Sequence, residues 1–435
     1  MSQIKLFGTT RSKGRAAPGG QGAKRKKQRS PLKILLIILI VLAALEALYF
    51  TCIYSNIPFI AKWRDIYIHT AMETMNHQWL ATAFIPQSVI DAAMGDQSQQ
   101  IQAQVGKEST WGGEQPPEEA PQKPQTPTVQ KPDEPETNPG EEQFYELFWE
   151  LDRSSVEAYL KQNPDALADG WEKLYINEAG LDDEGTSIRT TLDEQVLAVD
   201  VPNQLLLVRV EGDGYQGVLA VAKDPARLSV QNASTLGSVG QVAGRIANDN
   251  NGVLSMTAST FIDQDGKGNG GVLAGYAMSD GEGIGQHMGW GHKRLELRRD
   301  DRMYIVDVGS PVHENTRDAV EFMPALIIDG EMLTSDPGFS LYSGTNPRSV
   351  IGQSEKGEAL MLVIEGRLPG RSLGTSVKEC AEILQRHACM QAMNLDGGTS
   401  AIMWYDGEYV TKCSNTATPE GRYLPNAFVY KRAGN

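Results

Sequence analysis

Apolar and polar positions divide the chain into stretches of different character. Residues 34–54 are almost continuously apolar, close to the roughly 20 residues that an α-helix needs to cross a bilayer. Residues 55–95 space their apolar side chains as a helix does, which predicts a juxtamembrane helical segment. The same spacing recurs early in residues 143–185 and predicts a small helical segment. From residue 186 to the end, short β-type runs alternate with turns, as expected for the main folded domain.

This last stretch, residues 186–435, predicts an α+β domain with a mixed, mostly antiparallel sheet and a few helices. Asp-Gly pairs between the β-type runs are typical of hairpin turns. One helix is expected over residues 238–249, and a clearer one begins with the capping box Ser376-Val377-Lys378-Glu379. Strands are expected at residues 204–210, 217–222, 253–262, 272–278, 303–308, 326–328, 359–364, 391–395, 401–404 and 427–430.

Residues 96–142 differ from both neighbours in composition. They consist largely of Gln, Pro, Glu, Lys and Thr, with eight prolines between Gln115 and Gly140. A segment this poor in apolar residues cannot bury enough surface to fold, and its prolines stiffen it. We therefore predict a disordered linker that holds the domain away from the membrane.

Charge at the N-terminus predicts the orientation of the chain. Residues 1–33 contain ten Lys or Arg and no Asp or Glu. Positive charge before a first span keeps that side in the cytoplasm. We therefore expect a basic cytoplasmic tail at 1–33, a single transmembrane helix at 34–54 in the cell membrane, and an extracellular domain. A cleaved signal peptide is the alternative, disfavoured by the length of the apolar run.

After the predicted span, the chain contains 30 basic and 54 acidic residues. This acidic balance argues against nucleic acid as a partner, because phosphate backbones are bound by basic surfaces. Cysteine and histidine spacing gives no zinc-binding pattern, so neither a metal nor another cofactor is expected. The membrane, through one N-terminal helix, is the predicted partner at this stage.

The segment Asn394-Leu395-Asp396-Gly397-Gly398-Thr399-Ser400 is the strongest candidate for chemistry. Apolar runs on both sides predict a hairpin that reverses at the two glycines, with Asp396 held rigidly at the strand end. Glycine amides in such a turn can form a concave donor site for an anion. The alternative is a plain turn in which the aspartate caps its own backbone.

Three further features precede or follow this motif in a fixed order. They are the segment Asn346 to Gly352, the segment Val363 to Arg367, and the capped helix, with Arg422 and Asn426 downstream of the motif. Together these features resemble the phosphodiester glycosidase family over roughly residues 217–430. The resemblance implies a glycosidase that hydrolyses the bond between a sugar anomeric carbon and a phosphate. For a membrane-anchored bacterial member it implies a sugar-phosphate polymer of the cell envelope, or exopolysaccharide, as substrate.

The sequence also departs from the family pattern. Members usually carry an Asn-Gly-Gly-Phe-Phe-Asp-like segment, and the matching residues here are Ala258-Ser259-Thr260-Phe261-Ile262-Asp263. The Asn and both glycines are replaced, and Thr399 replaces a third glycine after Asp-Gly-Gly. The lost groups motivate an alternative function, a non-catalytic module that binds or helps assemble envelope polysaccharide. An amidase or esterase is a weaker alternative, because the sequence contains no Gly-x-Ser-x-Gly motif.

Cleavage of a glycosyl phosphate requires an anion clamp and carboxylates at the anomeric carbon. Arg348 is the first candidate for the clamp, because a guanidinium matches phosphate bidentately, and a surface salt bridge is its alternative role. Arg367 can do the same or pair with Glu365. Asp396 and Glu365 form the predicted carboxylate pair, with separated pKa values and unassigned roles. Glu365 is alternatively a solvated turn residue.

Further substrate contacts are predicted around this core. Asp263 retains the family's acidic position and is expected to orient a sugar hydroxyl. Asn394 is two residues before Asp396, so both side chains point to one face of a strand. The turn residues Gly397, Gly398, Thr399 and Ser400 are expected to bind substrate.

Overall fold

The computed structural model describes residues 31–74, 77–111, 139–263, 268–336 and 339–434. The chain divides into two compact units, Met1–Ser55 and Asn56–Asn435, which are described separately. In the first unit the described residues form one helix, α1 (Pro31–Tyr54), which is long and apolar enough to cross a membrane. The expected span over residues 34–54 falls within it. Most of the predicted basic tail lies outside the described residues.

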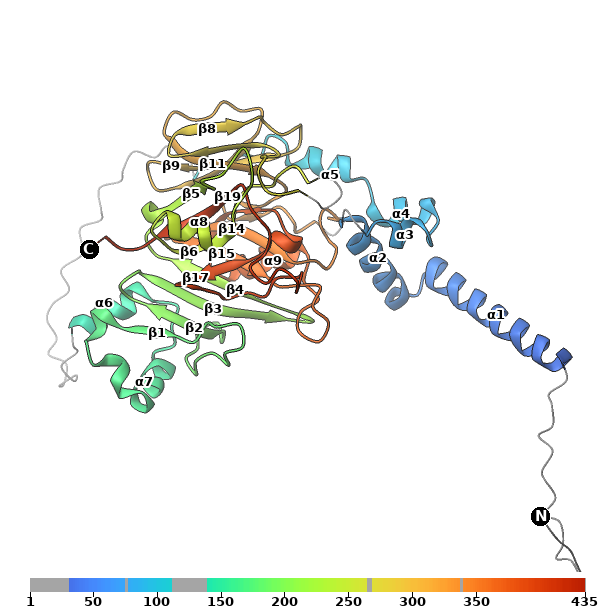
Figure 1. Cartoon of the computed structure of the whole chain (residues 1–435), viewed down its shortest axis with the longest axis horizontal. Coiled ribbons are helices and arrows are strands. Elements are labelled where there is room, and N and C mark those ends of the chain that lie inside the picture. Colours follow the sequence, from blue (N-terminus) through green and yellow to red (C-terminus); the bar gives the residue numbers. More distant parts are fainter. Residues whose placement is uncertain (1–30, 75–76, 112–138, 264–267, 337–338, 435) are drawn as a thin grey trace, which may run out of the picture. The chain divides into compact units, whose positions relative to one another are not determined.

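The second unit begins with short helices (Figure 1). Two of them, α2 and α3, are joined by a hydrogen bond from the Tyr67 hydroxyl to the carbonyl of Leu80, 2.9 Å long. The four helices are α2 (Pro58–Met72), α3 (Trp79–Thr82), α4 (Gln87–Met94) and α5 (Gln97–Gln104).

Residues 97–111, which the prediction assigned to the linker, are instead folded against the domain. The amide of Gln100 donates to Ser340 at 2.9 Å, and the hydroxyl of Ser109 donates to Gln391 at 2.7 Å. These polar side chains hold the segment through hydrogen bonds rather than through buried apolar surface, so composition alone did not predict the contact. Residues 112–138 of the predicted linker lie outside the described part of the chain, and its last residues, 139–142, belong to the helix Pro139–Leu147.

A nine-stranded sheet forms the centre of the second unit, and its described strands all pair antiparallel. Its strands, in spatial order, are β1 (Tyr175–Asn177), β2 (Gln195–Asp200), β3 (Leu205–Gly212), β4 (Tyr215–Ala222), β15 (Ala359–Ile364), β14 (Arg348–Ser354), β16 (Cys389–Asn394), β12 (Ala325–Ile328) and β13 (Glu331–Met332).

Two five-stranded antiparallel sheets complete the β structure. The first consists of β10 (Met303–Asp307), β9 (Lys293–Arg298), β11 (Thr316–Phe322), β7 (Tyr276–Ser279) and β8 (Glu282–Gly285). The second consists of β18 (Glu408–Tyr409), β17 (Met403–Tyr405), β6 (Gly252–Thr257), β19 (Asn426–Lys431) and β5 (Leu228–Asn232).

Alternation along the strands of the central sheet places its two faces in different cores. On β3, Leu205 and Leu207 pack in a core shared with both five-stranded sheets, whereas Leu206 and Val208 pack on the opposite face. The helix α9 (Val377–Arg386) covers that opposite face. This is the period of two expected of a strand buried on both sides. The central sheet is therefore held between two apolar layers.

The predicted small helical segment is joined to this sheet. Its helices are α6 (Pro139–Leu147) and α7 (Arg153–Gln162), with short 3-10 turns at Pro164–Leu167 and Trp171–Lys173. Phe144, Phe148 and Val156 pack in the same core as α9, and β1 then adds to the edge of the sheet. Because β1 pairs with β2, the segment is continuous with the domain.

The predicted fold class is confirmed: helices are few and the sheets are antiparallel. The capped helix is α9, whose capping box of Ser376 and Glu379 is formed as expected. The other predicted helix is shorter, α8 (Ala243–Asp249). Several strands were not predicted, among them β9, β11 and β14, because charged and polar side chains interrupt their apolar pattern.

Candidate functional site

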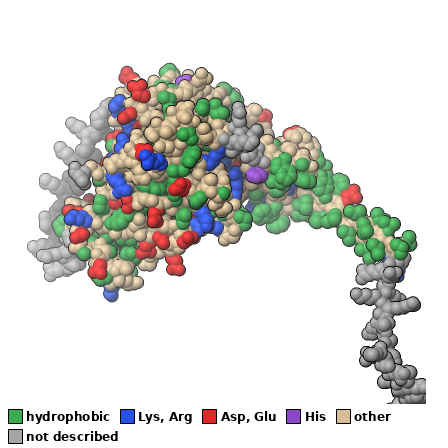
Figure 2. Space-filling model, viewed as in Figure 1, with side chains coloured by type: hydrophobic (Ala, Val, Ile, Leu, Met, Phe, Trp, Pro, Cys, Tyr) green, Lys and Arg blue, Asp and Glu red, His purple; other side chains and the backbone are tan. Residues whose placement is uncertain are grey.

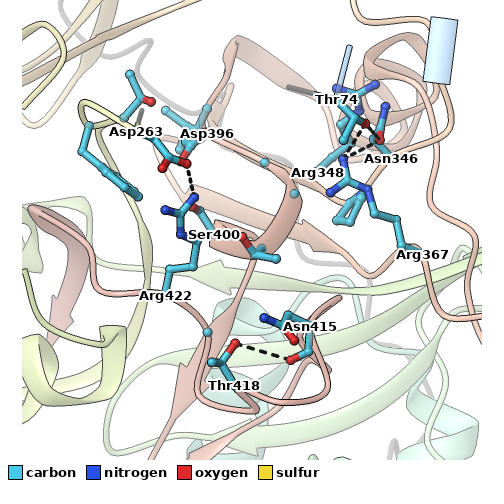
Figure 3. A pocket seen from close by; sticks show the side chains of 18 of the residues that line it. Thr74, Asp263, Asn346, Arg348, Arg367, Asp396, Ser400, Asn415, Thr418 and Arg422 are labelled. Carbon is cyan, nitrogen blue, oxygen red and sulfur yellow. Dashed lines mark hydrogen bonds and ion pairs between the residues drawn. The ribbon is translucent and has the colours of Figure 1, made fainter. Parts of the chain in front are cut away.

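A cavity of about 1080 Å³ opens at the ends of strands from two different sheets. Arg367 follows β15 and Arg348 begins β14, both in the nine-stranded sheet, whereas Asp263 follows β6 in the second five-stranded sheet. Figure 3 shows the two groups on opposite sides, with Arg348, Arg367, Asn346 and Thr74 together and Asp263, Asp396 and Arg422 together. The cavity thus has a cationic wall and an acidic wall.

Asp396 lies where the chain leaves one sheet and enters another. β16 belongs to the nine-stranded sheet and β17 to a five-stranded one, so the predicted hairpin around Gly397 and Gly398 is wrong. Local apolar alternation predicts strands but does not say which strand each will pair with. The two glycines are still required: Gly398 has a φ of +60°, and a side chain on Gly397 would lie 2.6 Å from the carbonyl oxygen of Pro347.

The carboxyl group of Asp396 is electrostatically perturbed. Burial raises its pKa to about 6, against a smaller opposing effect of a hydrogen bond with Ser400 and the charge of Arg422. The nearby charge of Asp263 raises it further. A carboxylate of this kind is poorly solvated when ionised and changes protonation state near neutral pH, as acid or base catalysts do.

Asp263, in contrast, is held in its ionised form. It forms an ion pair with Arg422 and accepts a hydrogen bond from the amide of Gly268 at 2.6 Å. The hydrogen bond from Arg422 is the main reason why the pKa of Asp263 lies below its ordinary value. Arg422 also stacks over the ring of Phe261, 4.6 Å from its centroid. Asp263 therefore stays ionised across the range in which Asp396 titrates.

The cavity thus holds a carboxylate pair with separated pKa values, but its second member is Asp263 and not Glu365. Glu365 is buried outside the cavity lining. Its oxygens pair with Arg371 at 2.5 Å and accept from the backbone amide of Lys412 at 2.7 Å. Period-two alternation placed Glu365 at a strand end but did not show that its side chain lies outside the cavity.

The predicted anion clamp, Arg348, already has a carboxylate partner. Its Nη2 lies 2.9 Å from Oε2 of Glu73, at the end of α2. The same guanidinium donates to the carbonyls of Tyr342, Gly344 and Thr375 at 2.8, 2.6 and 3.0 Å. Arg348 lines the cavity, but its charge already has a carboxylate partner in Glu73.

Arg367 is the guanidinium of the cationic wall that lacks a carboxylate partner among the described residues. Its Nη2 donates to the neutral side chains of Thr74 and Asn346, at 3.0 and 2.8 Å. Burial, and then the charge of Arg348, hold its pKa below the ordinary value. Its backbone adopts a φ of +58°, an uncommon conformation for a non-glycine residue. An anion in the cavity would supply the missing countercharge.

Asn394 and Ser400 line the cavity as predicted. Asn394 donates through Nδ2 to the carbonyl of Met323 at 2.9 Å, while its buried Oδ1 has no hydrogen-bond partner in the described structure. A substrate hydroxyl is a suitable donor for that oxygen.

The turn after Asp396 does not form the predicted anion site from glycine amides. The amide of Gly398 donates to the carbonyl of Pro347 at 3.2 Å, and that of Gly397 stabilises the ionised form of Asp396. Gly397, Gly398 and Thr399 still line the cavity. The aspartate therefore caps its own backbone, the alternative interpretation, while remaining in the cavity.

Two parts of the cavity wall were not predicted. One is the end of α2 with the residues after it: Glu73, Thr74 and His77. The other is the loop of residues 415–423, in which only Arg422 had been noticed as part of the family pattern. Both contacts join residues far apart in sequence, and no local pattern signals them. Among the residues that the structure describes, no group of three or more His, Cys, Asp or Glu is placed to hold a metal ion.

One comparison with known proteins gives a family match. The sequence model of the phosphodiester glycosidase family matches residues 244–431, which include every predicted site residue. The predicted resemblance to the family is confirmed over these residues. No curated protein sequence matches the chain.

Solved structures with similar folds include the catalytic domain of zebrafish N-acetylglucosamine-1-phosphodiester alpha-N-acetylglucosaminidase, auto-inhibited by its pro-peptide. It is 17% identical, with a TM-score of 0.43, over 53% of this chain and 82% of that chain. A hypothetical protein from Synechocystis is 14% identical, with a TM-score of 0.37, over 56% of this chain and 65% of that chain.

Proposed function

We propose that the protein is a hydrolase that cleaves the bond between a sugar anomeric carbon and a phosphodiester. Arg367 binds the phosphate and Asp396 acts at the anomeric carbon. The observation that carries this proposal is the pairing, across one cavity, of an uncompensated guanidinium with a carboxylate of raised pKa. The family match over residues 244–431 supports the same reaction.

The chemistry of the leaving group favours a basic role for Asp396. Cleavage of the anomeric carbon–oxygen bond leaves its electron pair on a phosphate oxygen, and a phosphate monoester has its second pKa near 6. Such a group departs at neutral pH with little protonation. The attacking water, in contrast, must lose a proton, which the desolvated Asp396 carboxylate accepts. The products are a free sugar and a phosphate monoester.

Asp263 and Arg422 support this step. The positive charge that develops at the anomeric carbon is stabilised by nearby negative charge. Asp263 contributes such charge, and its ion pair with Arg422 fixes its direction. We propose that Asn394 accepts a hydrogen bond from a sugar hydroxyl through its unpartnered Oδ1.

The direct test is to incubate the purified full chain with a glycosyl-1-phosphate diester and to measure free sugar. Release of sugar together with an equal amount of phosphate monoester supports the proposal. Binding of the diester without turnover would favour the alternative, a non-catalytic module that binds envelope polysaccharide. That alternative rests on the replaced Asn-Gly-Gly of the family pattern at residues 258–260.

Replacing Arg367 with Gln should weaken catalysis selectively. Loss of a charge-assisted contact to phosphate is worth roughly 2–3 kcal/mol, or about a hundredfold in kcat/KM. A neutral aryl glycoside of the same sugar should be cleaved within a few-fold of the wild-type rate. Arg245→Gln, on the exposed face of α8, is the matched control and should change neither rate. An equal loss on both substrates would contradict the anion-binding role.

The pH dependence of kcat/KM should report Asp396. If the ionised form is active, kcat/KM is constant above the pKa of about 6 and falls as the pH drops below it. The fall is about tenfold per pH unit, because the ionised fraction declines at that rate. A pH profile from 4.5 to 8, in ~0.5 unit steps, measures this limb. A limb of opposite direction, with activity lost above pH 6, would assign Asp396 as a general acid instead.

The cellular setting is also a proposal. The basic residues before α1 and the acidic balance after it favour an outward-facing domain anchored in the cell membrane. Sugar-phosphate polymers of the envelope and exopolysaccharide are then the substrates within reach. Protease accessibility of the domain in intact cells tests the orientation, and an intact α1 in the mature protein excludes signal cleavage.

A further inference from the structure

Exposed aromatic side chains gather on the first helices of the second unit. Beyond Asn56, five of the eight aromatic side chains that are exposed in the described structure lie between Phe59 and Phe84. Figure 2 shows hydrophobic side chains gathered over α2 to α4. Elsewhere exposed aromatics occur singly, as at Trp290. A concentration of this kind marks an interaction surface.

One face of α2 supplies most of this surface. Phe59, Trp63 and Tyr67 follow each other at intervals of four residues, so they lie on the same side of the helix. Phe59 is 71% exposed, Trp63 54% and Tyr67 45%, while Ile68 and Ala71 on the other side are buried. The Tyr67 hydroxyl bonds to α3, which carries Trp79, 57% exposed. We call Phe59, Trp63, Tyr67 and Trp79 the aromatic surface.

The short connection between α1 and α2 restricts which partner can cover this surface. Only residues 55–57 separate the end of α1 from the start of α2. An extended chain spans at most about 3.6 Å per residue, so α2 begins within roughly 14 Å of the end of α1. If α1 spans the bilayer, that distance lies within the headgroup layer and its immediate surroundings. Tryptophan and tyrosine favour this layer, and the exposed Lys62 suits anionic lipid.

We propose that the aromatic surface is a membrane-binding site that lies in the lipid headgroup layer of the bilayer crossed by α1. Helix α2 then rests on the bilayer through Phe59, Trp63 and Tyr67, and α3 adds Trp79. The second unit is thereby held to the membrane by two elements, a span and an interfacial surface, instead of by a flexible tether.

The same segment also forms part of the cavity. Glu73 and Thr74, directly after α2, contact Arg348 and Arg367 of the cationic wall. A membrane-bound α2 therefore holds the phosphate-binding end of the cavity near the headgroups. This consequence rests on the proposed function: the preferred substrate is a glycosyl phosphodiester whose other alcohol is a membrane lipid.

Tryptophan fluorescence tests the membrane site without reference to activity. The full chain has seven tryptophans, and none lies in α1. It is reconstituted in phosphatidylcholine vesicles containing phosphatidylglycerol, with and without bromine on the upper acyl carbons, which quenches tryptophan by contact. Wild type should be quenched, and the Trp63→Phe/Trp79→Phe variant should lose most of the quenching. Trp290→Phe removes an equally exposed indole, 59% exposed, and should retain it.

Three results would overturn the proposal. The first is wild-type fluorescence that brominated lipid does not quench, and the second is quenching that the double variant retains. The third is a disulfide between two copies of a Trp63→Cys variant in a Cys52→Ser background, formed in the same vesicles, which would assign the surface to a second copy of the chain.

Activity then tests the substrate separately. The variant Phe59→Ser/Trp63→Ser/Trp79→Ser should cleave a lipid-linked glycosyl phosphate in the vesicles at least severalfold more slowly than wild type. It should cleave a water-soluble diester at the wild-type rate, since none of the three residues lines the cavity. Equal rates on both substrates would overturn the lipid-linked preference. Cleavage of neither substrate by wild type would contradict the proposed function and leave the fluorescence result standing.

Discussion

Replacing Asp396 with Asn is expected to lower kcat/KM on a glycosyl phosphodiester by about three orders of magnitude. A positioned acid or base contributes roughly 10² to 10⁴ to the rate, and Asn has the shape of Asp but cannot accept the proton of water. The measurement is free sugar released by the purified full chain, with single-turnover kinetics to separate binding from chemistry.

This variant should also be at least as stable as wild type. The pKa of Asp396 lies near 6 in the folded protein against an ordinary 3.8, so the ionised group destabilises the folded state at neutral pH. That cost diminishes as the pH falls from about 6 towards 3.8, and Asn removes it at every pH. A thermal midpoint at or above that of wild type would therefore accompany the loss of activity.

Glu365→Gln is the informative comparison. The sequence suggested Glu365 as the partner of Asp396, whereas the structure pairs it with Arg371 and the amide of Lys412 outside the cavity. We expect Glu365→Gln to lose stability and to retain activity within a few-fold at temperatures where it is folded. If a folded Glu365→Gln protein lost as much activity as Asp396→Asn, the assignment of Asp263 as the second carboxylate would be wrong.

Replacing Arg348 with Met is expected to lower the free energy of unfolding by about 3–5 kcal/mol. Removal of one member of a buried ion pair leaves the other charge unpaired, and here three carbonyl groups also lose a donor. Arg245→Met breaks a surface pair with Asp249 and should cost less than about 1 kcal/mol. Urea denaturation of both variants measures the difference in their free energies of unfolding. Limited proteolysis at the residues that follow α2 is measured alongside.

The pKa of Glu73, the partner of Arg348, predicts the pH range in which this ion pair stabilises the folded state. Burial alone would raise the pKa of Glu73, but the His69 side chain, whose Nδ1 lies 3.7 Å from Oε1 of Glu73, and the charge of Arg348 together hold it below its ordinary 4.5. The stabilisation is therefore complete above pH 4.5 and is lost as the pH falls below it. Adding Glu73→Met to Arg348→Met should restore part of the stability, because both charges are then absent. Unchanged stability of Arg348→Met with selective loss of phosphate substrates would instead favour the clamp predicted from sequence.

The sequence predicted those structural features that are determined by residues close together in the chain. The helix α9 follows from a capping box and from apolar residues three and four apart, both visible in the eleven residues from Ser376 to Arg386. Strand β14 was not predicted, although all its residues are buried, because Gln353 is satisfied by the carbonyls of Asp301 and Gly357 rather than by apolar contact. Burial of a polar residue depends on distant partners, which a local pattern does not contain.

The candidate site shows the same difference between features set by nearby residues and features set by distant ones. The motif around Asp396 correctly located the cavity, because a glycine-rich strand end is a local feature. The exclusion of Glu365 and the neutralisation of Arg348 by Glu73 were not predictable, since Glu73 and Arg348 are 275 residues apart. Asp263 was found only through the family pattern, and its pairing with Arg422 joins residues 159 positions apart.

The two walls of the cavity belong to different sheets, so the distance between the walls depends on the core layer between those sheets. Met393 and Met403 lie on either side of the connection that carries Asp396, one in each sheet, and both are buried in the core that the sheets share. The separation between the two sheets, whose strand ends lead into the segments of Arg367 and Asp263, is thus set by the thickness of a core layer. Catalysis tolerates misplacement of only about 1 Å before rates fall steeply. Under the proposed function, selection on turnover would therefore act on side-chain volumes in the protein interior, far from the cavity itself.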